Sequence, residues 1–118
     1  MNVEFFLPWP DKRLSPNWRG HWAPKAAATK RAKRDAYYAA LEAGVRKTEA
    51  EKVAVKFVFY PPDNRPRDAD NIMAAHKAAI DGIRDAIGID DSKFEISFSK
   101  AGAIQRNGMV KVTLEWEA

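Results

Sequence analysis

The chain has 118 residues, of which 46% are hydrophobic, and a formal net charge of +4. This length and apolar content predict one compact domain over residues 1–118 with a single core. The absence of cysteine excludes disulfides and thiolate metal sites and favours a reducing compartment. No run of ~20 apolar residues and no secretory leader are found, so we expect a soluble, unprocessed cytoplasmic protein.

Residues 2–7 predict a first strand, which ends where Pro8 and Pro10 remove backbone donors. The loop over residues 8–24 that follows is rich in basic and aromatic side chains. Such a composition is suited to phosphate contacts and base stacking on nucleic acid. The equally weighted alternative is that its tryptophans anchor the loop to the core or to a partner subunit. The basic members are Lys12, Arg13 and Arg19.

Residues 24–45 predict a helix because they are rich in alanine and other strong helix formers. Tyr37, Leu41 and Val45 fall on one stripe, and that stripe continues backward into a basic first half. We expect this first half to extend beyond the core and to meet DNA phosphates or another subunit, whereas a solvated face is the plain alternative. The basic residues concerned are Lys30, Lys33 and Arg34.

Residues 52–60 predict the clearest strand, in which every second residue from Val53 to Phe59 is apolar. Pro61 and Pro62 end it. The next loop carries Arg65 and Arg67 immediately before two aspartates, where they could draw phosphates toward the carboxylates or pair with neighbouring aspartates.

A second helix is expected from about Asn71 to Ile87. His76 lies on its apolar stripe, which predicts a core or interface histidine rather than a metal ligand or general base. Lys77 follows Asp70 by seven residues and would return to the same side of a continuous helix. Its ammonium is therefore a candidate electrostatic partner of a phosphate held near the carboxylates.

Residues 93–100 and 109–116 predict two further strands, and Asn107-Gly108 indicates a tight turn between them. The resulting order is β-α-β-α-β-β. This order predicts an α+β fold in which two helices pack on a small mixed sheet.

Two acidic motifs stand out in this basic chain: Arg67-Asp68-Ala69-Asp70-Asn71, and Gly88-Ile89-Asp90-Asp91. Mg²⁺ is commonly held by one or two carboxylates while its other positions remain open to water and phosphate. Each motif also has a plain structural alternative. The first would cap a helix, and the second would form a turn between a helix and a strand.

These motifs resemble the RusA family of Holliday junction resolvases, in an order that covers nearly the whole chain. The shared features are Leu7-Pro8-Trp9-Pro10, Ser15-Pro16-Asn17, the Arg-Asp-x-Asp-Asn core and Asp90-Asp91. The resemblance implies a homodimeric endodeoxyribonuclease that resolves four-way DNA junctions by paired nicks. It further implies Mg²⁺, with Mn²⁺ as a substitute, held by Asp68, Asp70 and Asp91 with help from Asp90.

The chain departs from the family pattern at one position. A lysine often follows the second aspartate by four residues in that family, whereas this chain has Ala74 there and Lys77 three residues later. Lys77 is therefore the candidate catalytic lysine. The expected DNA contacts are Lys12, Arg13, Asn17, Arg19, Lys30, Lys33, Arg34, Arg65 and Arg67.

Two other functions remain open at the level of sequence. A catalytically silent DNA-binding module would be equally basic, because phosphate contacts dominate such binding. A small metal-dependent hydrolase of another substrate is disfavoured, because no Gly-rich phosphate loop is present and no nucleotide cofactor is expected.

Overall fold

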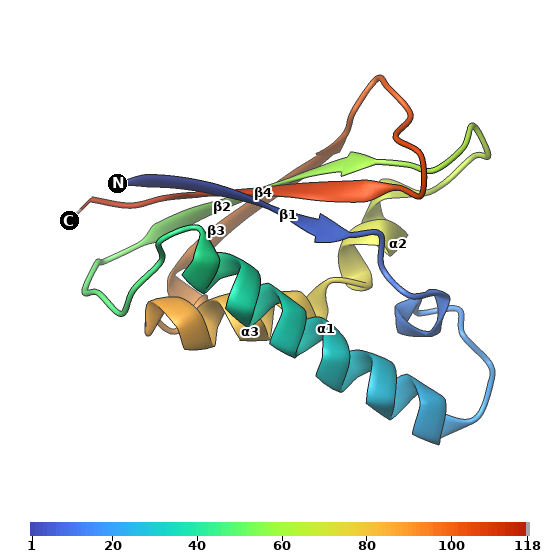
Figure 1. The fold of residues 1–118 in the computed structure, drawn as a ribbon, viewed down its shortest axis with the longest axis horizontal. Coiled ribbons are helices and arrows are strands. Elements are labelled where there is room, and N and C mark those ends of the chain that lie inside the picture. Colours follow the sequence, from blue (N-terminus) through green and yellow to red (C-terminus); the bar gives the residue numbers. More distant parts are fainter. Residues whose placement is uncertain (118) are drawn as a thin grey trace.

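The structure is a computed structural model that describes residues 1–117, and its centre is one mixed four-stranded sheet (Figure 1). The strand order is β1-β4-β2-β3. The central strand β4 runs antiparallel to both of its neighbours, whereas β2 and β3 are parallel. The strands are β1 (Asn2–Pro8), β2 (Val53–Tyr60), β3 (Phe94–Lys100) and β4 (Met109–Glu115).

The two central strands supply most of the core from one face of the sheet. Val55 pairs with Leu114 and Phe57 pairs with Val112, and all four side chains are fully buried. The alternation predicted for residues 52–60 is therefore confirmed. The side chains between them, such as Lys56, point to the opposite face and remain exposed.

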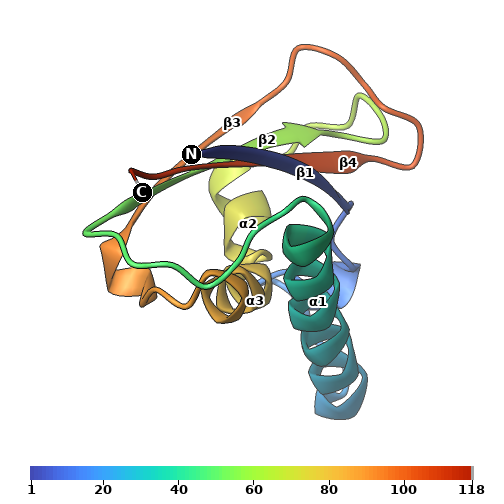
Figure 2. The same ribbon diagram turned by 60° about the vertical axis from the view of Figure 1, so that its left-hand side comes forward.

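Two helices, α1 (Trp22–Glu42) and α3 (Lys77–Ile87), cover the buried face of the sheet and pack against each other (Figure 2). They approach closely at Gly82, where an added Cβ would lie 2.2 Å from the Lys33 carbonyl oxygen. On α1, Ala36 and Ala40 are fully buried, and Ala36 lies at this contact. The predicted stripe also packs against the core, since Tyr37 and Leu41 are partly buried there and Val45 is fully buried. The first half of α1 extends beyond the sheet, as expected (Figure 2).

The helix predicted over residues 71–87 is wrong as one element. The structure has a short helix α2 (Ala69–Ala74) and a separate helix α3, with a break at Ala75 and His76. His76 explains the break: its Nδ1 bonds the Ile72 carbonyl oxygen at 2.8 Å, while its backbone N–H donates to Met73 instead. A side chain that takes the carbonyl four residues back competes with the backbone ladder and allows the chain to turn.

Strand β3 lies at an edge of the sheet, and its apolar side chains are less covered than its alternation suggests. Ile96 pairs with Val55 and Phe98 with Phe57, so both face the helix side of the sheet. They are nevertheless 40% and 37% exposed, because α1 and α3 do not extend over this edge.

A tight turn forms at Asn107-Gly108, where both residues have positive φ and Gly108 donates its N–H to Gln105. It is not the turn of a hairpin, because β2 lies between β3 and β4 in the sheet. Two 3₁₀ turns complete the fold, η1 (Lys12–Leu14) and η2 (Asp91–Lys93). Within residues 1–117, no helix has the length and apolar character needed to cross a membrane.

Candidate functional site

The first acidic motif forms the start of α2. Asp68 is the N-cap residue, and its Oδ1 accepts a hydrogen bond from the Asp70 backbone N–H at 2.8 Å. The capping alternative is therefore correct for Asp68. Asp70 lies in the first turn and is exposed, and within residues 1–117 its carboxylate takes part in no hydrogen bond or ion pair. Its oxygens are thus free for a ligand.

The arginines before this motif are held by Asp63. Arg67 Nη1 lies 2.8 Å from Asp63 Oδ1, and Arg65 Nε lies 3.2 Å from Oδ2 of the same carboxylate. Hydrogen bonds from Arg67, then from Arg65, hold the pKa of Asp63 well below its usual range. The guanidinium of Arg67 also lies 5.6 Å from the centroid of the Trp9 ring. The alternative that these arginines pair with neighbouring aspartates is therefore correct for Asp63, whose Asp-x-Arg-x-Arg spacing is the signal in the sequence.

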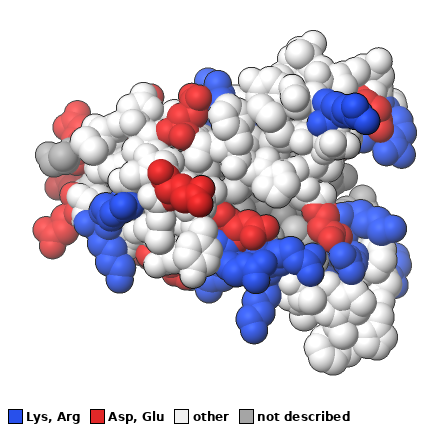
Figure 3. Space-filling model, in the orientation of Figure 1, with Lys and Arg blue, Asp and Glu red and all other residues white. Residues whose placement is uncertain are grey.

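Loop 8–21 and the start of α2 enclose a groove of about 310 Å³. It brings together residues far apart in the chain, namely Trp9, Lys12, Arg67 and Asp68, with Asn71 beside them. Figure 3 shows a hollow on its right-hand side, between the end with loops 61–68 and 101–108 and the end with loop 8–21. We call the space lined by these five residues the Asp68 groove. It joins cationic, aromatic and acidic groups in one place.

The second acidic motif lies at the other end of β3. Asp90 Oδ2 accepts a hydrogen bond from the Ser92 N–H at 3.1 Å, and hydrogen bonding to Ser92 lowers its pKa. Asp91 Oδ2 lies 3.8 Å from Arg84. The turn alternative is therefore correct for Asp90.

The two acidic motifs do not meet within the chain. Lys100, at the end of β3, donates to the Arg67 carbonyl oxygen at 2.9 Å, whereas Asp91 precedes the start of β3 at Phe94. Strand β3, which is seven residues and about 20 Å long, lies between these two points. In agreement, the described residues contain no group of three aspartate, glutamate or histidine side chains placed to hold one metal ion.

Lys77 is the first residue of α3 and is exposed. Because α2 and α3 are separate helices, its position relative to Asp70 does not follow from helical periodicity. The two residues between the helices, Ala75-His76, determine the position of Lys77 relative to Asp70 instead.

The other predicted DNA contacts differ in how free their charges are. Arg13 Nη2 lies 2.7 Å from Asp11, and this pairing lowers the pKa of Asp11 to about 2. Lys33 lies 3.4 Å from Asp85 on α3, and Arg34 lies 3.8 Å from its neighbour Asp35. Figure 3 shows red acidic side chains next to blue basic ones on the lower part of the molecule. Three of the predicted basic contacts are exposed and have no ion pair within residues 1–117: Lys12, Arg19 and Lys30. Asn17 is also exposed.

Comparison with known proteins gives one relative and no family assignment by model. No protein-family model matches the chain. The chain is 37% identical over 111 residues to an "Uncharacterized protein" of Xylella fastidiosa (strain Temecula1 / ATCC 700964). The matched region covers 92% of this chain and 72% of the relative. The chain therefore belongs to the same protein family as the Xylella protein.

Proposed function

We propose that the protein is a metal-dependent endodeoxyribonuclease that cuts four-way DNA junctions. The Asp68 groove carries this proposal, because it places the cations Lys12 and Arg67 beside the carboxylate of Asp68, next to the free carboxylate of Asp70. Cations would hold a DNA phosphate there, while the carboxylates would hold Mg²⁺ or Mn²⁺. The bound ion would lower the pKa of a water molecule and stabilise charge on the attacked phosphate.

Because the two acidic motifs lie apart within one chain, we infer that a second copy of the chain completes the metal site. Antiparallel pairing of two β3 edges, centred on Ser97, would place Phe94 of one protomer opposite Lys100 of the other. Because α2 contacts β3, Asp91 of the partner would then approach Asp68 and Asp70. The proposed metal site is therefore composite, and this geometry favours the homodimer that paired nicking requires.

The surface of β3 supports such pairing. In this register Ile96 of each protomer would lie opposite Phe98 of its partner, on the same side of the sheet. These two side chains are among the exposed large hydrophobic residues of the protein. An unpaired edge strand also presents backbone donors and acceptors to another chain.

Mixing two inactive variants tests the composite site. We expect Asp70→Asn and Asp91→Asn each to lose Mg²⁺-dependent nicking of a synthetic four-way junction. After unfolding and refolding together, the mixed dimer has one intact composite site, so single nicks should return without paired cuts. If each protomer held a complete site, the mixture would remain inactive. Linear duplex and reactions without metal serve as controls.

The second candidate is a catalytically silent module that binds branched or duplex DNA. It is favoured by the fact that Asp68 and Asp90 both cap local structure. It predicts junction binding with no strand cleavage in Mg²⁺ or Mn²⁺. The same cleavage assay therefore separates the two functions.

A further inference from the structure

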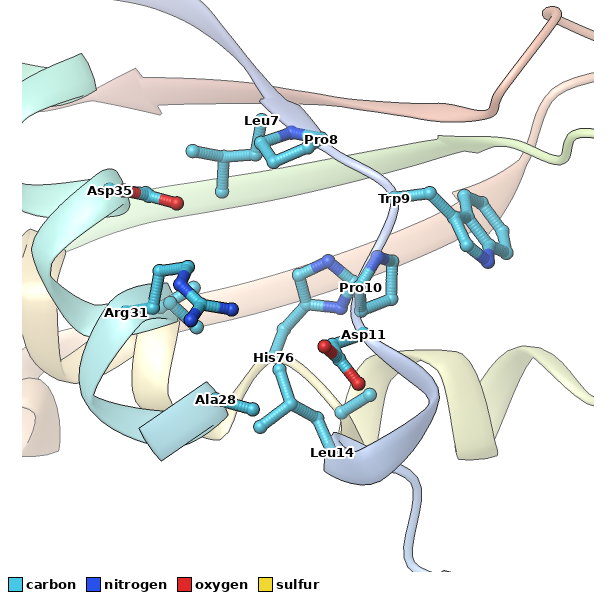
Figure 4. Close-up of a pocket in the computed structure, with 13 residues that line it drawn as sticks. Leu7, Pro8, Trp9, Pro10, Asp11, Leu14, Ala28, Arg31, Asp35 and His76 are labelled. Carbon is cyan, nitrogen blue, oxygen red and sulfur yellow. The ribbon is translucent and has the colours of Figure 1, made fainter. Parts of the chain in front are cut away.

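A second cavity, of about 250 Å³, shares the segment Trp9–Asp11 with the Asp68 groove, and Figure 4 shows the residues that line it. We call it the His76 cavity. Its walls are mainly apolar and come from the end of β1, loop 8–21, α1 and the break between α2 and α3. The apolar walls include Leu7, Pro8, Pro10, Leu14, Ala28 and Ala79.

His76 lines this cavity, and its ring carries a buried polar atom that has no hydrogen-bond partner within residues 1–117. The side chain is 3% exposed, and its ring is fixed between Phe57 and Phe59, with centroid distances of 5.4 and 5.3 Å. Among the described residues, Nε2 is one of two buried side-chain polar atoms without a hydrogen bond. Figure 4 shows the ring extending into the space below Leu7 and Pro8. Buried polar atoms usually have a partner, so this one points to a ligand.

The hydrogen bonds of His76 fix which kind of group could bind it. Nδ1 faces the Ile72 carbonyl oxygen, which only accepts, so Nδ1 carries the proton. Burial lowers the pKa of the ring, which keeps it neutral. Nε2 is consequently an acceptor, and the ligand must present an N–H or O–H donor.

The mouth of the cavity adds one available positive charge. Arg31 is exposed and has no ion pair within residues 1–117, whereas Asp11 is neutralised by Arg13. Asp35 also lines the mouth, 3.8 Å from Arg34. Pockets for drug-sized ligands usually have volumes of about 300–1,000 Å³, and the His76 cavity is smaller than this. Its size therefore suits one ring system and not a larger ligand.

We propose that the His76 cavity binds one unstacked nucleobase of the DNA strand that occupies the Asp68 groove. An unpaired base offers the N–H that pairing would otherwise occupy, its ring suits the apolar walls, and Arg31 could hold the adjoining phosphate. The two cavities share Trp9, Pro10, Asp11 and Ala75, so a single strand can reach both. This inference rests on the proposed DNA substrate, but it concerns base recognition and not cleavage.

The first experiment measures binding in the absence of metal. Four-way junctions carry a single abasic residue at successive positions around the branch point. We expect about a tenfold loss of affinity at one position, the scale of losing one stacked, hydrogen-bonded base. Ala28→Leu, which fills the cavity, and His76→Phe, which removes the acceptor, should bind about tenfold more weakly and show no such position. Ala27→Leu, on the exposed side of the same helix, is the matched control.

The second experiment needs no DNA strand. The chain has only two histidines, so the ¹⁵N resonance of His76 Nε2 can be assigned, and exposed His21 is an internal control. Adding free nucleosides should move the His76 resonance and leave that of His21 unchanged. If His76→Phe fails to fold in a melting experiment, Ala28→Leu carries the test in both experiments.

Two results would overturn the inference. One is an affinity that does not depend on the position of the abasic residue, together with a His76 resonance that no nucleoside moves. The other is a position dependence that persists in Ala28→Leu, since the base would then be read elsewhere. A protein that shows the position dependence but never cleaves in Mg²⁺ would contradict only the nuclease proposal.

Discussion

Asp70 differs from the other acidic residues of the two motifs because its carboxylate is not used by the fold. Asp68 and Asp90 accept backbone hydrogen bonds, and Asp91 lies near Arg84. The carboxylate of Asp70 is exposed and takes part in no hydrogen bond or ion pair within residues 1–117, so its oxygens can bind a ligand without disturbing local structure. In the proposed metal site, we therefore assign Asp70 the most direct contact with the metal ion.

Asp70→Asn should lower Mg²⁺-dependent junction cleavage by about 10²-fold or more while changing the free energy of unfolding by less than about 0.5 kcal/mol. The amide removes the charge that holds the cation but breaks no contact. Denaturant unfolding and nicking rates provide the two measurements. Asp68→Ala is the comparison, because loss of the cap should cost about 1 kcal/mol. Wild-type nicking by Asp70→Asn would exclude a metal-ligand role.

Lys77→Ala should lower the cleavage rate by about 10²-fold with little loss of junction affinity, if its ammonium stabilises the attacked phosphate. Lys77→Arg should restore activity only in part, because a planar guanidinium does not replace a compact charge. Lys56→Ala, on the open face of the sheet, is the control. Normal cleavage with weak binding would instead make Lys77 an ordinary phosphate contact.

His76 should make the protein less stable in mild acid. Burial lowers its pKa below 6.5, so beneath that pH the unfolded chain binds a proton that the folded chain does not. The contribution is complete above pH 6.5 and is lost as the pH falls, by up to about 1.4 kcal/mol per pH unit. Urea unfolding of the wild type between pH 7 and pH 5 should show this slope. In His76→Phe the slope should be reduced, and equal slopes would contradict the assignment.

At the scale of elements, the packing of α1 on α3 depends on a residue without a side chain. Gly82→Ala would place a Cβ 2.2 Å from the Lys33 carbonyl oxygen, so the helices must separate. We expect destabilisation by about 1–3 kcal/mol, although alanine is the better helix former by about 1 kcal/mol. Gly102→Ala, where nothing lies within 4 Å, is the control. An increased melting temperature for Gly82→Ala would contradict this account.

The four strands and the first helix follow from periodicity and end signals, because each depends on residues close together in the sequence. The break at Ala75-His76 does not, because it depends on a ring held between Phe57 and Phe59, which belong to a distant strand. The burial of His76 was nevertheless correctly predicted from its position on an apolar stripe. Helical periodicity predicted the face on which His76 lies, whereas its hydrogen bond depends on tertiary contacts.

In the candidate site, too, one part can be predicted from residues close in the sequence and another part depends on tertiary contacts. The sequence predicts that Arg67 and Asp68 act together, since they are adjacent, and the structure adds Trp9 and Lys12 from the other end of the chain. The separation of Asp68 from Asp91 could not be predicted, because it depends on the direction of β3. Strand direction follows from the parallel pairing of β2 with β3, which no local pattern records.

At the scale of the whole molecule, the proposed dimer can be tested through the exposed edge of β3. Ile96→Ser combined with Phe98→Ser should leave the fold intact, because both side chains are partly exposed. It should shift the protein to a monomer in sedimentation velocity and abolish cleavage together with dimerisation. Phe6→Ser, which is 51% exposed on β1, is the control. A cleaving monomer would contradict the composite site.

The place of β4 in the sheet has a consequence for synthesis. Residues 109–115 form a central strand that separates β1 from β2, and every hydrogen bond that β1 makes in the sheet goes to β4. Until residues 109–115 have been synthesised, β1 has no partner strand, and β2 lacks its neighbour on that side. The nascent chain therefore exposes aggregation-prone strand edges until residues 109–115 have emerged.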